Sequence, residues 1–425
     1  MPDRTRLSRR SLLKRAGLIS GALVLGGAAV LDRTLWRDDP VPGYLSGFND
    51  DFVAYSTSSA AASVLPELKA AGGRCIRIGV DWGRVQADGP DSWDWSYLDP
   101  IQIQCLAAGV EILPTVFGCP EWAGPVVTAS RRAVKGSPYP DDSFRTCSPE
   151  FDGEFGRFAD ATLRRLDAPR KLAEVPRLVS AVEILNEPNF WIFGDVPADR
   201  LRELTTAAAE AVNTSEQAGA FSNPMRVLSG GLAPLSSIAA GEKSAFPPRP
   251  SWQDYLSELT SAGPLGFDIG VHSYELGKPP AGEVTAPESN PTDPYARARE
   301  FATWQTGRIV ERVDEALALT SRDIWLTETG ASSASTWPED VFTPEYRLAH
   351  GEEIQAEVLS GVADALKSRP RCRSMIVHRL YSDDEAEPPP NQGSGFSSDY
   401  FQYGVYDAID GAPKLAVAAL AEAWG

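Results

Sequence analysis

Two glutamates in the chain each follow a short apolar run. Glu187 stands in the stretch V-E-I-L-N-E-P-N, and Pro188 behind it does not continue a strand. Glu328 stands in I-W-L-T-E-T-G, at the end of a second apolar run. Because the carboxyl ends of parallel strands meet at one rim, we expect both carboxylates there. Two facing carboxylates suit the hydrolysis of a glycosidic bond: one protonates the departing oxygen, and the other attacks the anomeric carbon or activates water.

The two glutamates need opposite protonation states for this chemistry. As general acid, Glu187 must keep its proton near neutral pH, and partial burial together with the charge of Glu328 would raise its pKa. Glu328 must stay ionised, which Arg77 and the hydroxyl of Tyr274 would favour. Asn186 offers a neutral amide beside the acid, suited to holding a sugar hydroxyl in the transition state. We expect these five residues to form one site.

Each motif also has a purely structural interpretation. Asn-Glu-Pro can end a strand with a turn, and Glu328 can satisfy N–H groups at the start of a helix. The order of the two motifs and their separation by about three βα units favour catalysis. Glu121 and Glu183 are also acidic, but Glu121 belongs to a long loop and Glu183 lies within a strand. Neither is predicted to be catalytic.

The elements that would position these residues alternate along the chain. Short runs rich in Val and Ile alternate with amphipathic helical stretches, which is typical of βα units around a parallel sheet. The expected strands span residues 44–48, 75–80, 111–116, 180–185, 226–230, 267–271, 323–327 and 374–379. The expected helices span residues 60–71, 98–108, 151–166, 201–218, 296–317 and 344–366. A doubly wound open sheet would alternate in the same way, but no Gly-rich phosphate turn follows the first strand. The pattern predicts an α/β protein, a (β/α)8 TIM barrel with a single catalytic domain.

These motifs resemble the clan A glycoside hydrolases, the 4/7 superfamily, and within it most closely family 39 and the nearby family 5 and cellulase-like exported enzymes. Such barrels carry an Asn-Glu-Pro acid/base after strand four and a glutamate nucleophile at the end of strand seven. Arg77 resembles the arginine that steadies the nucleophile, and His272–Tyr274 resembles the H-x-Y whose tyrosine hydrogen-bonds it. The resemblance extends over about residues 44 to 424. It implies a retaining glycosidase for β-linked sugars, with Glu187 as acid/base and Glu328 as nucleophile.

Two aromatic residues extend the resemblance and mark where it departs. The stretch P-E-W-A resembles the aromatic segment after strand three, which would make Trp122 a platform for a sugar ring. Many clan members present a tryptophan beneath the sugar at strand eight, whereas this chain has V-H-R-L-Y there. We expect Tyr381 to take that place.

The amino-terminal segment predicts export. Residues 8–14, S-R-R-S-L-L-K, resemble a twin-arginine signal, and the apolar run at residues 16–31 follows. A short membrane anchor is the alternative, because no clear A-x-A cleavage site follows the run. We therefore divide the chain into a signal or anchor at residues 1–31, a linker at 32–42 and the barrel at 43–425. Either alternative places the barrel outside the cytoplasm.

Charge and composition narrow the partners. The formal net charge of −18 argues against a nucleic acid or an anionic membrane as partner of the barrel and suits an uncharged carbohydrate. The five cysteines lack any C-x-x-C spacing, and the three histidines do not cluster, so we expect no metal and no cofactor. Cys119 and Cys147 bracket a Pro- and Ser-rich stretch, and they form either a disulfide or two ordinary buried thiols.

Three functions fit these observations. The leading one is an exported retaining hydrolase that degrades a β-linked poly- or oligosaccharide. A non-catalytic glycan-binding barrel is the second, since a fold does not guarantee chemistry, and a transglycosylase on the same scaffold is the third. We expect a monomer in each case.

Overall fold

The computed structural model describes residues 44–49, 61–126, 145–172, 177–239, 248–263, 265–275, 279–289, 292–333, 343–382, 403–407 and 411–425. The predicted export signal at residues 1–31 and the predicted linker at 32–42 lie outside these ranges. Across the described ranges, no helix combines the length and the apolar character needed to cross a membrane.

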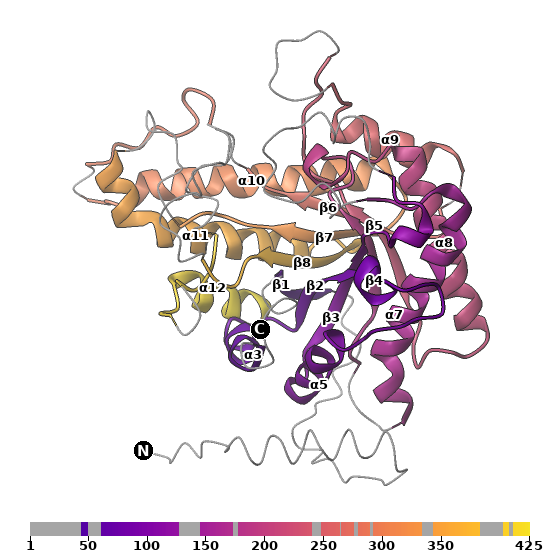
Figure 1. Ribbon diagram of the computed structural model, residues 1–425. Helices are drawn as coiled ribbons and strands as arrows, with labels where there is room; N and C mark the ends of the chain where they lie inside the picture. Colours follow the sequence, from indigo (N-terminus) through magenta and orange to yellow (C-terminus); the bar gives the residue numbers. More distant parts are fainter. Residues whose placement is uncertain are drawn as a thin grey trace, which may run out of the picture.

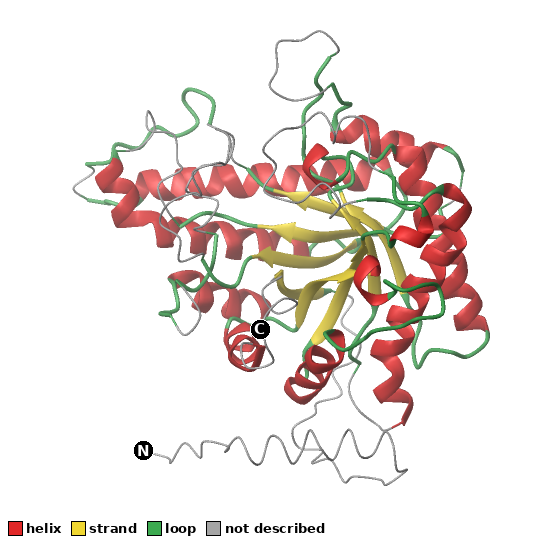
Figure 2. Ribbon diagram, in the orientation of Figure 1, coloured by secondary structure: helices red, strands yellow, loops and turns green. Residues whose placement is uncertain are grey.

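Eight parallel strands occupy the centre of the protein and helices surround them (Figure 1) (Figure 2). The strands follow one another around the sheet in the order β5-β4-β3-β2-β1-β8-β7-β6. They are β1 (Leu45–Asn49), β2 (Cys75–Asp81), β3 (Glu111–Phe117), β4 (Ala181–Asn186), β5 (Arg226–Gly231), β6 (Ile269–Ser273), β7 (Ile324–Thr329) and β8 (Cys372–His378). Isolated parallel bridges from β5 to β6, Leu228 to Asp268 and Leu232 to Val271, bring the two edges together. The predicted (β/α)8 barrel is confirmed.

The helices cover the outside of this barrel, and their ends carry ordinary helix signals. The longer ones are α3 (Ala61–Ala70), α5 (Leu98–Ala108), α7 (Asp152–Leu172), α8 (Ala198–Gln217), α9 (Trp252–Ser261), α10 (Ala296–Leu319), α11 (Pro344–Lys367) and α12 (Leu415–Trp424). The side chain of Thr343 accepts a hydrogen bond from the amide of Tyr346 and Pro344 follows it, so α11 begins there. Gly109 adopts a left-handed conformation with φ of 68° and ends α5.

The sequence pattern did not indicate α9 and α12, and both helices are short. In α9, Ser251 accepts a hydrogen bond from the amide of Asp254 and caps a helix of 10 residues. In α12, the sequence L-A-V-A-A-L-A-E-A-W is apolar nearly all round, so it lacks the periodicity that reveals an amphipathic helix. Figure 1 shows α12 near α3, and the ring of Trp424 packs edge-on against Phe48 of β1 with 5.5 Å between centroids.

Successive side chains of a strand point to opposite faces, so this barrel has an outer and an inner core. The outer core lies between strands and helices and includes Ile76, Val116 and Ile184. The inner core, which we call the lower layer, fills the barrel and consists of Leu45, Cys75, Leu113, Ala181, Leu228, Trp325 and Ile376. Further along the same strand faces lie polar residues, which we call the upper layer: Asn49, Arg77, Thr115, Glu183, His272 and His378. The interior therefore changes from apolar to polar toward the carboxyl ends of the strands.

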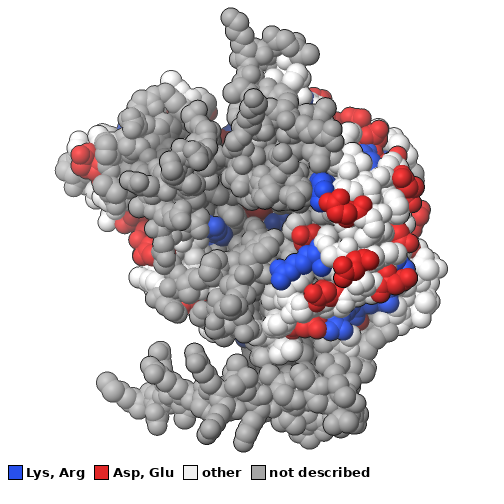
Figure 3. Space-filling model, viewed as in Figure 1, with Lys and Arg blue, Asp and Glu red and all other residues white. Residues whose placement is uncertain are grey.

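The described cysteines are free and buried, Cys119 and Cys147 among them. The thiol of Cys119 donates to the Ala123 carbonyl and that of Cys147 to Asp152, at 3.7 Å each. Of the two alternatives, the structure has the buried thiols. Over α7 and α8, acidic and basic side chains are intermixed (Figure 3).

Candidate active site

The chain turns sharply where β4 ends, and the turn presents Glu187. Leu185 and Glu187 have positive φ angles of 68° and 39°, a conformation that side chains other than glycine rarely adopt. The carbonyl of Glu187 accepts a hydrogen bond of 2.8 Å from the amide of Phe190. Asn189 holds the turn to the end of β5, because its side chain both donates to the carbonyl and accepts from the amide of Ala233. Strained backbone of this kind is concentrated at functional sites.

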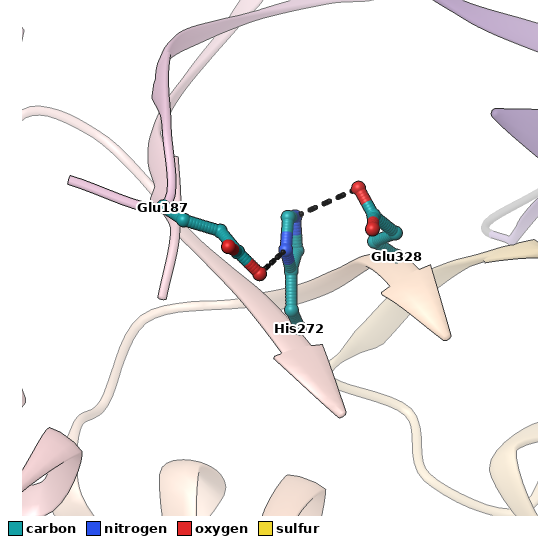
Figure 4. Close-up of side chains that lie close together, drawn as sticks. All are labelled: Glu187, His272 and Glu328. Atoms are coloured by element: carbon teal, nitrogen blue, oxygen red, sulfur yellow. Dashed lines mark hydrogen bonds and ion pairs between the residues drawn. The ribbon is translucent and has the colours of Figure 1, made fainter. Parts of the chain in front are cut away.

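The imidazole of His272, at the end of β6, lies between the two glutamates (Figure 4). Its Nδ1 is 2.9 Å from Oε1 of Glu187, and its Nε2 is 3.8 Å from Oε2 of Glu328. One carboxylate oxygen from each glutamate and one ring nitrogen of His272 all lie within 4.8 Å of one another. Gly231 of β5 makes room for the ring, since a Cβ there would come within 2.2 Å of Nε2. The two carboxylates predicted to share a rim do so.

Glu328 of β7 accepts hydrogen bonds from three other elements. The hydroxyl of Tyr274 donates to Oε1 at 2.6 Å, and Nη1 of Arg77 donates to Oε2 at 3.2 Å. The side-chain amide of Asn49 donates to Oε2 at 3.4 Å. Hydrogen bonds from a cation and from neutral donors stabilise a charged carboxylate. These three donors fix the orientation of the Glu328 carboxyl group.

The guanidinium of Arg77 connects Glu328 to the acid/base turn. It is 3% exposed, and Nη2 donates to Oδ1 of Asn186 at 2.7 Å. Nη1 also donates to Oδ1 of Asn49 at 3.2 Å, and Nε donates to Glu183 at 2.7 Å. Arg77 thus orients both Glu328 and Asn186, the residue that precedes Glu187.

Burial shifts the pKa values of Glu187 and His272 in opposite directions. It raises the pKa of the Glu187 carboxyl to about 8; of the charged neighbours, Arg77 lowers this pKa and Glu183 raises it. Burial also lowers the pKa of His272 to about 4, so the ring is neutral near pH 7 and carries one N–H. Glu187 therefore holds a proton at neutral pH. The expectation that burial raises this pKa is confirmed, but the neighbouring anion that raises it further is Glu183, whereas the sequence pattern suggested Glu328.

The structure does not bring the two predicted aromatic platforms to the glutamates. The indole of Trp122 donates to the Gln86 carbonyl at 2.6 Å and packs edge-on against Trp82 of α4 (Trp82–Val85) and against Phe151. Tyr381 is buried, and its hydroxyl donates to Glu67 of α3 while its ring packs against Tyr406. Tyr381 lies beyond the end of β8 at His378, and these contacts direct its side chain toward the helix layer.

Four upper-layer residues were not predicted from the sequence to belong to the site. Asn49 and His378 end β1 and β8, their side chains are 3.2 Å apart, and Nδ1 of His378 is 3.8 Å from Oε1 of Glu328. Thr115 and Glu183 lie deeper and contact one another. Strand alternation was the available signal, because each follows a lower-layer residue by two or four positions on the same face.

Glu187, His272 and Glu328 are also the described residues whose donor atoms lie close enough to hold a metal ion. The Arg77 guanidinium already supplies a positive charge 3.2 Å from Glu328, and Glu187 keeps its proton at neutral pH. Metal ligation requires deprotonated ligands, so this donor set suits proton transfer and we assign no metal to it.

Comparisons with known proteins agree with this geometry at the level of the fold. No family model matches the chain, and no curated protein matches its sequence. A GH5_18 structure from Streptomyces cattleya in complex with Manb1-4GlcNAc is 15% identical, with 90% of this chain and 80% of that chain covered and a TM-score of 0.54. A GH5_18 structure from Bifidobacterium longum subsp. infantis is 12% identical, with coverage of 90% and 78% and a TM-score of 0.51.

An exo-β-1,4-mannosidase from Opitutaceae bacterium strain TAV5 is 14% identical over 93% of this chain and 62% of that chain, with a TM-score of 0.51. These similarities show that the chain shares the fold of these proteins. What the residues do within that fold rests on the site itself.

Proposed function

We propose that this chain is an exported retaining glycoside hydrolase that cleaves β-linked glycosidic bonds in a poly- or oligosaccharide. The observation that carries the proposal is the pair of rim glutamates in opposite environments. Glu187 is buried and holds a proton at neutral pH, whereas Glu328 accepts from Arg77 and Tyr274. A protonated carboxyl group and a second carboxylate at the same rim of the barrel are what glycoside hydrolysis requires.

The separation of the carboxylates supports the retaining mechanism. Oxygens of Glu187 and Glu328 lie within 4.8 Å of one another. Retaining enzymes place their carboxyl groups roughly 5–5.5 Å apart, whereas inverting enzymes need about 6.5–9.5 Å to admit a water. The short separation favours direct attack by Glu328 on the anomeric carbon.

Two displacements complete the reaction. In the first, an oxygen of Glu328 bonds to the anomeric carbon, the glycosidic bond breaks and Glu187 gives its proton to the departing oxygen. In the second, Glu187 takes a proton from water, the water oxygen bonds to the anomeric carbon and the bond to Glu328 breaks. Asn186, held by Arg77 at 2.7 Å, is placed to bind a sugar hydroxyl beside the acid.

The substrate class follows from charge and from similar folds. The net charge of −18 disfavours anionic polymers. The Streptomyces cattleya structure contains Manb1-4GlcNAc, and the Opitutaceae protein is an exo-β-1,4-mannosidase. We therefore place β-mannosides first in a panel of β-linked aryl glycosides and polysaccharides. The twin-arginine motif at residues 8–14 supports the export that we propose.

Azide rescue of two alanine variants tests the assignment of roles. With an activated aryl glycoside, azide should restore turnover to Glu187→Ala and give an azide product of retained configuration, because the nucleophile is intact. With Glu328→Ala, azide takes the place of the nucleophile and the product configuration should be inverted. Glu121→Ala is the control, because the Glu121 side chain is 78% exposed and pairs with Arg145.

Three outcomes separate the alternatives. Wild-type activity in both glutamate variants contradicts the proposed roles. Loss of turnover in both variants, with azide rescuing neither, contradicts them as well. Binding without cleavage of any glycan in the panel favours the glycan-binding barrel. Transfer of the sugar to another sugar in preference to water favours the transglycosylase.

A further inference from the structure

Glu183 is a fully buried carboxylate inside the barrel. It lies on β4 four residues before Glu187, is 0% exposed and pairs in register with Thr115 of β3 and Leu228 of β5. Its Oε2 accepts hydrogen bonds of 2.7 Å from Nε of Arg77 and from the hydroxyl of Thr115. A carboxylate so deep in a protein is costly unless it is paired, and its pairing here is with the arginine of the active site.

The surrounding backbone leaves space for this side chain. A Cβ on Gly270 of β6 would come within 3.0 Å of Oε1 of Glu183 and within 2.5 Å of the Ser229 carbonyl. Oε1 has no hydrogen-bond partner among the described residues. Because Gly270 of β6 has no side chain, there is room for the Glu183 carboxyl group. Donors on β2 and β3 orient it.

Glu183 determines which way the Arg77 guanidinium faces. Both Nε and Nη2 of Arg77 lie 2.7 Å from Oε2 of Glu183. Nη2 also donates to Asn186, and Nη1 is left for Glu328 and Asn49. Those acceptors lie on β7, β1 and β4. The rigid fork of an arginine makes such an arrangement sensitive to the loss of any one partner.

We propose that Glu183 is a positioning residue of the active site, which aims Arg77 at Glu328 and, by pairing with Arg77, offsets the positive charge that the arginine brings to the turn carrying Glu187. This inference rests on the proposed role of Glu187 as general acid. Glu183 itself stays remote from the substrate and acts through its two neighbours.

The charges around Glu187 support this role. Arg77 of β2 and Glu183 of β4 are its charged neighbours. His272 of β6 contacts Glu187 directly, and Glu328 lies on the other side of the His272 ring, where it accepts a hydrogen bond from Tyr274. His272 is neutral near pH 7, since burial lowers its pKa to about 4. Arg77 lowers the pKa of Glu187 and Glu183 raises it. By pairing with Arg77, Glu183 also offsets part of the positive charge near Glu187.

The decisive experiment is a titration of Glu187 in the absence of substrate. In protein labelled with 13C at the glutamate carboxyl groups, Glu187 is assigned by the loss of its signal in Glu187→Gln. In Glu183→Gln, which keeps the size of the side chain and removes its charge, the pKa of Glu187 should fall by about one unit. The alkaline limb of kcat/KM should move to lower pH by the same amount.

Two matched variants separate charge from structure. Glu183→Asp keeps the charge, so the pKa of Glu187 should stay nearer the wild-type value than in Glu183→Gln. Thr115→Val removes the second hydrogen bond to Glu183 and no charge, so it should leave this pKa within about 0.3 unit of wild type. Near-ultraviolet circular dichroism checks that each variant keeps its packing.

An unchanged Glu187 titration in folded Glu183→Gln overturns the inference, as does an equal shift in Thr115→Val. Lower activity at every pH with an unmoved alkaline limb also overturns it, because that is the signature of a merely structural residue. If no glycan is cleaved but the titration shifts, the proposed function fails and the effect of Glu183 on Glu187 stands. If glycans are cleaved and the titration does not shift, only the inference fails.

Discussion

The lower and upper layers of the barrel interior come from the same strands and have opposite chemistry. On β4, Ala181 belongs to the apolar lower layer and Glu183, two residues on, is a buried carboxylate. On β2, Cys75 is followed on the same face by Arg77. In the lower layer each side chain contributes by filling space, whereas in the upper layer each polar group depends on a partner. In this barrel, the apolar lower layer therefore serves stability and the polar upper layer serves the active site.

Substitution of the nucleophile should give the largest effect and leave the lower layer intact. We expect Glu328→Gln to reduce kcat/KM by about 10⁴-fold or more, because the covalent step loses its attacking group. Steady-state kinetics on the best aryl glycoside measures this. Near wild-type activity in Glu328→Gln would contradict the role of Glu328 as nucleophile.

Truncation in the lower layer should act on stability and leave the site unchanged. Leu228 is 0% exposed, and we expect Leu228→Ala to lower the free energy of unfolding by about 2–5 kcal/mol. Urea denaturation measures the loss. Well below the unfolding transition, the pKa of Glu187 should match wild type, and a shifted pKa would show that the layers are coupled.

The pH dependence of activity tests the protonation state of Glu187 in the polar part of the barrel. The acid must be protonated, and the pKa of Glu187 is raised to about 8 by burial. Activity should therefore persist below about pH 8 and fall by about tenfold per pH unit well above it. Profiles of kcat/KM on substrates with poor and good leaving groups test this. An alkaline limb near the ordinary glutamate pKa contradicts the buried acid.

The smallest effect should come from Tyr381, which lies in neither layer. Because its hydroxyl donates to Glu67 of α3, we expect Tyr381→Phe to change kcat/KM by no more than about twofold. The free energy of unfolding should fall by about 0.5–1.5 kcal/mol for the lost hydrogen bond. A large rise in KM in this variant would restore Tyr381 as part of the sugar subsite.

Strand positions and rim residues could be predicted from sequence because periodicity reports them directly. The eight expected strands correspond to β1 through β8 with shifts of one or two residues at their ends. The rim glutamates followed because a polar residue after an apolar run marks a strand end. Asn186 ends β4, His272 and Tyr274 lie at the end of β6, and Arg77 lies within β2. The structure brings all four to the two glutamates.

The depth and direction of side chains could not be predicted in the same way. Glu183 was set aside because a charge within a strand is not at the rim, yet its pairing with Arg77 makes it part of the same network. Trp122 and Tyr381 lie outside the strands, where alternation no longer fixes direction, and both pack against other aromatic rings. Loop side chains follow tertiary packing, which a single sequence does not reveal.

The most direct test of the central claim is to trap the covalent intermediate. An activated 2-deoxy-2-fluoro-β-glycoside of the preferred sugar should inactivate the enzyme, because fluorine slows the second displacement more than a good leaving group slows the first. Peptide mass spectrometry should then find the sugar on Glu328, within residues 324–330. A label on Glu187 or elsewhere, or a first-formed product of inverted configuration, would contradict the assignment of Glu328 as nucleophile.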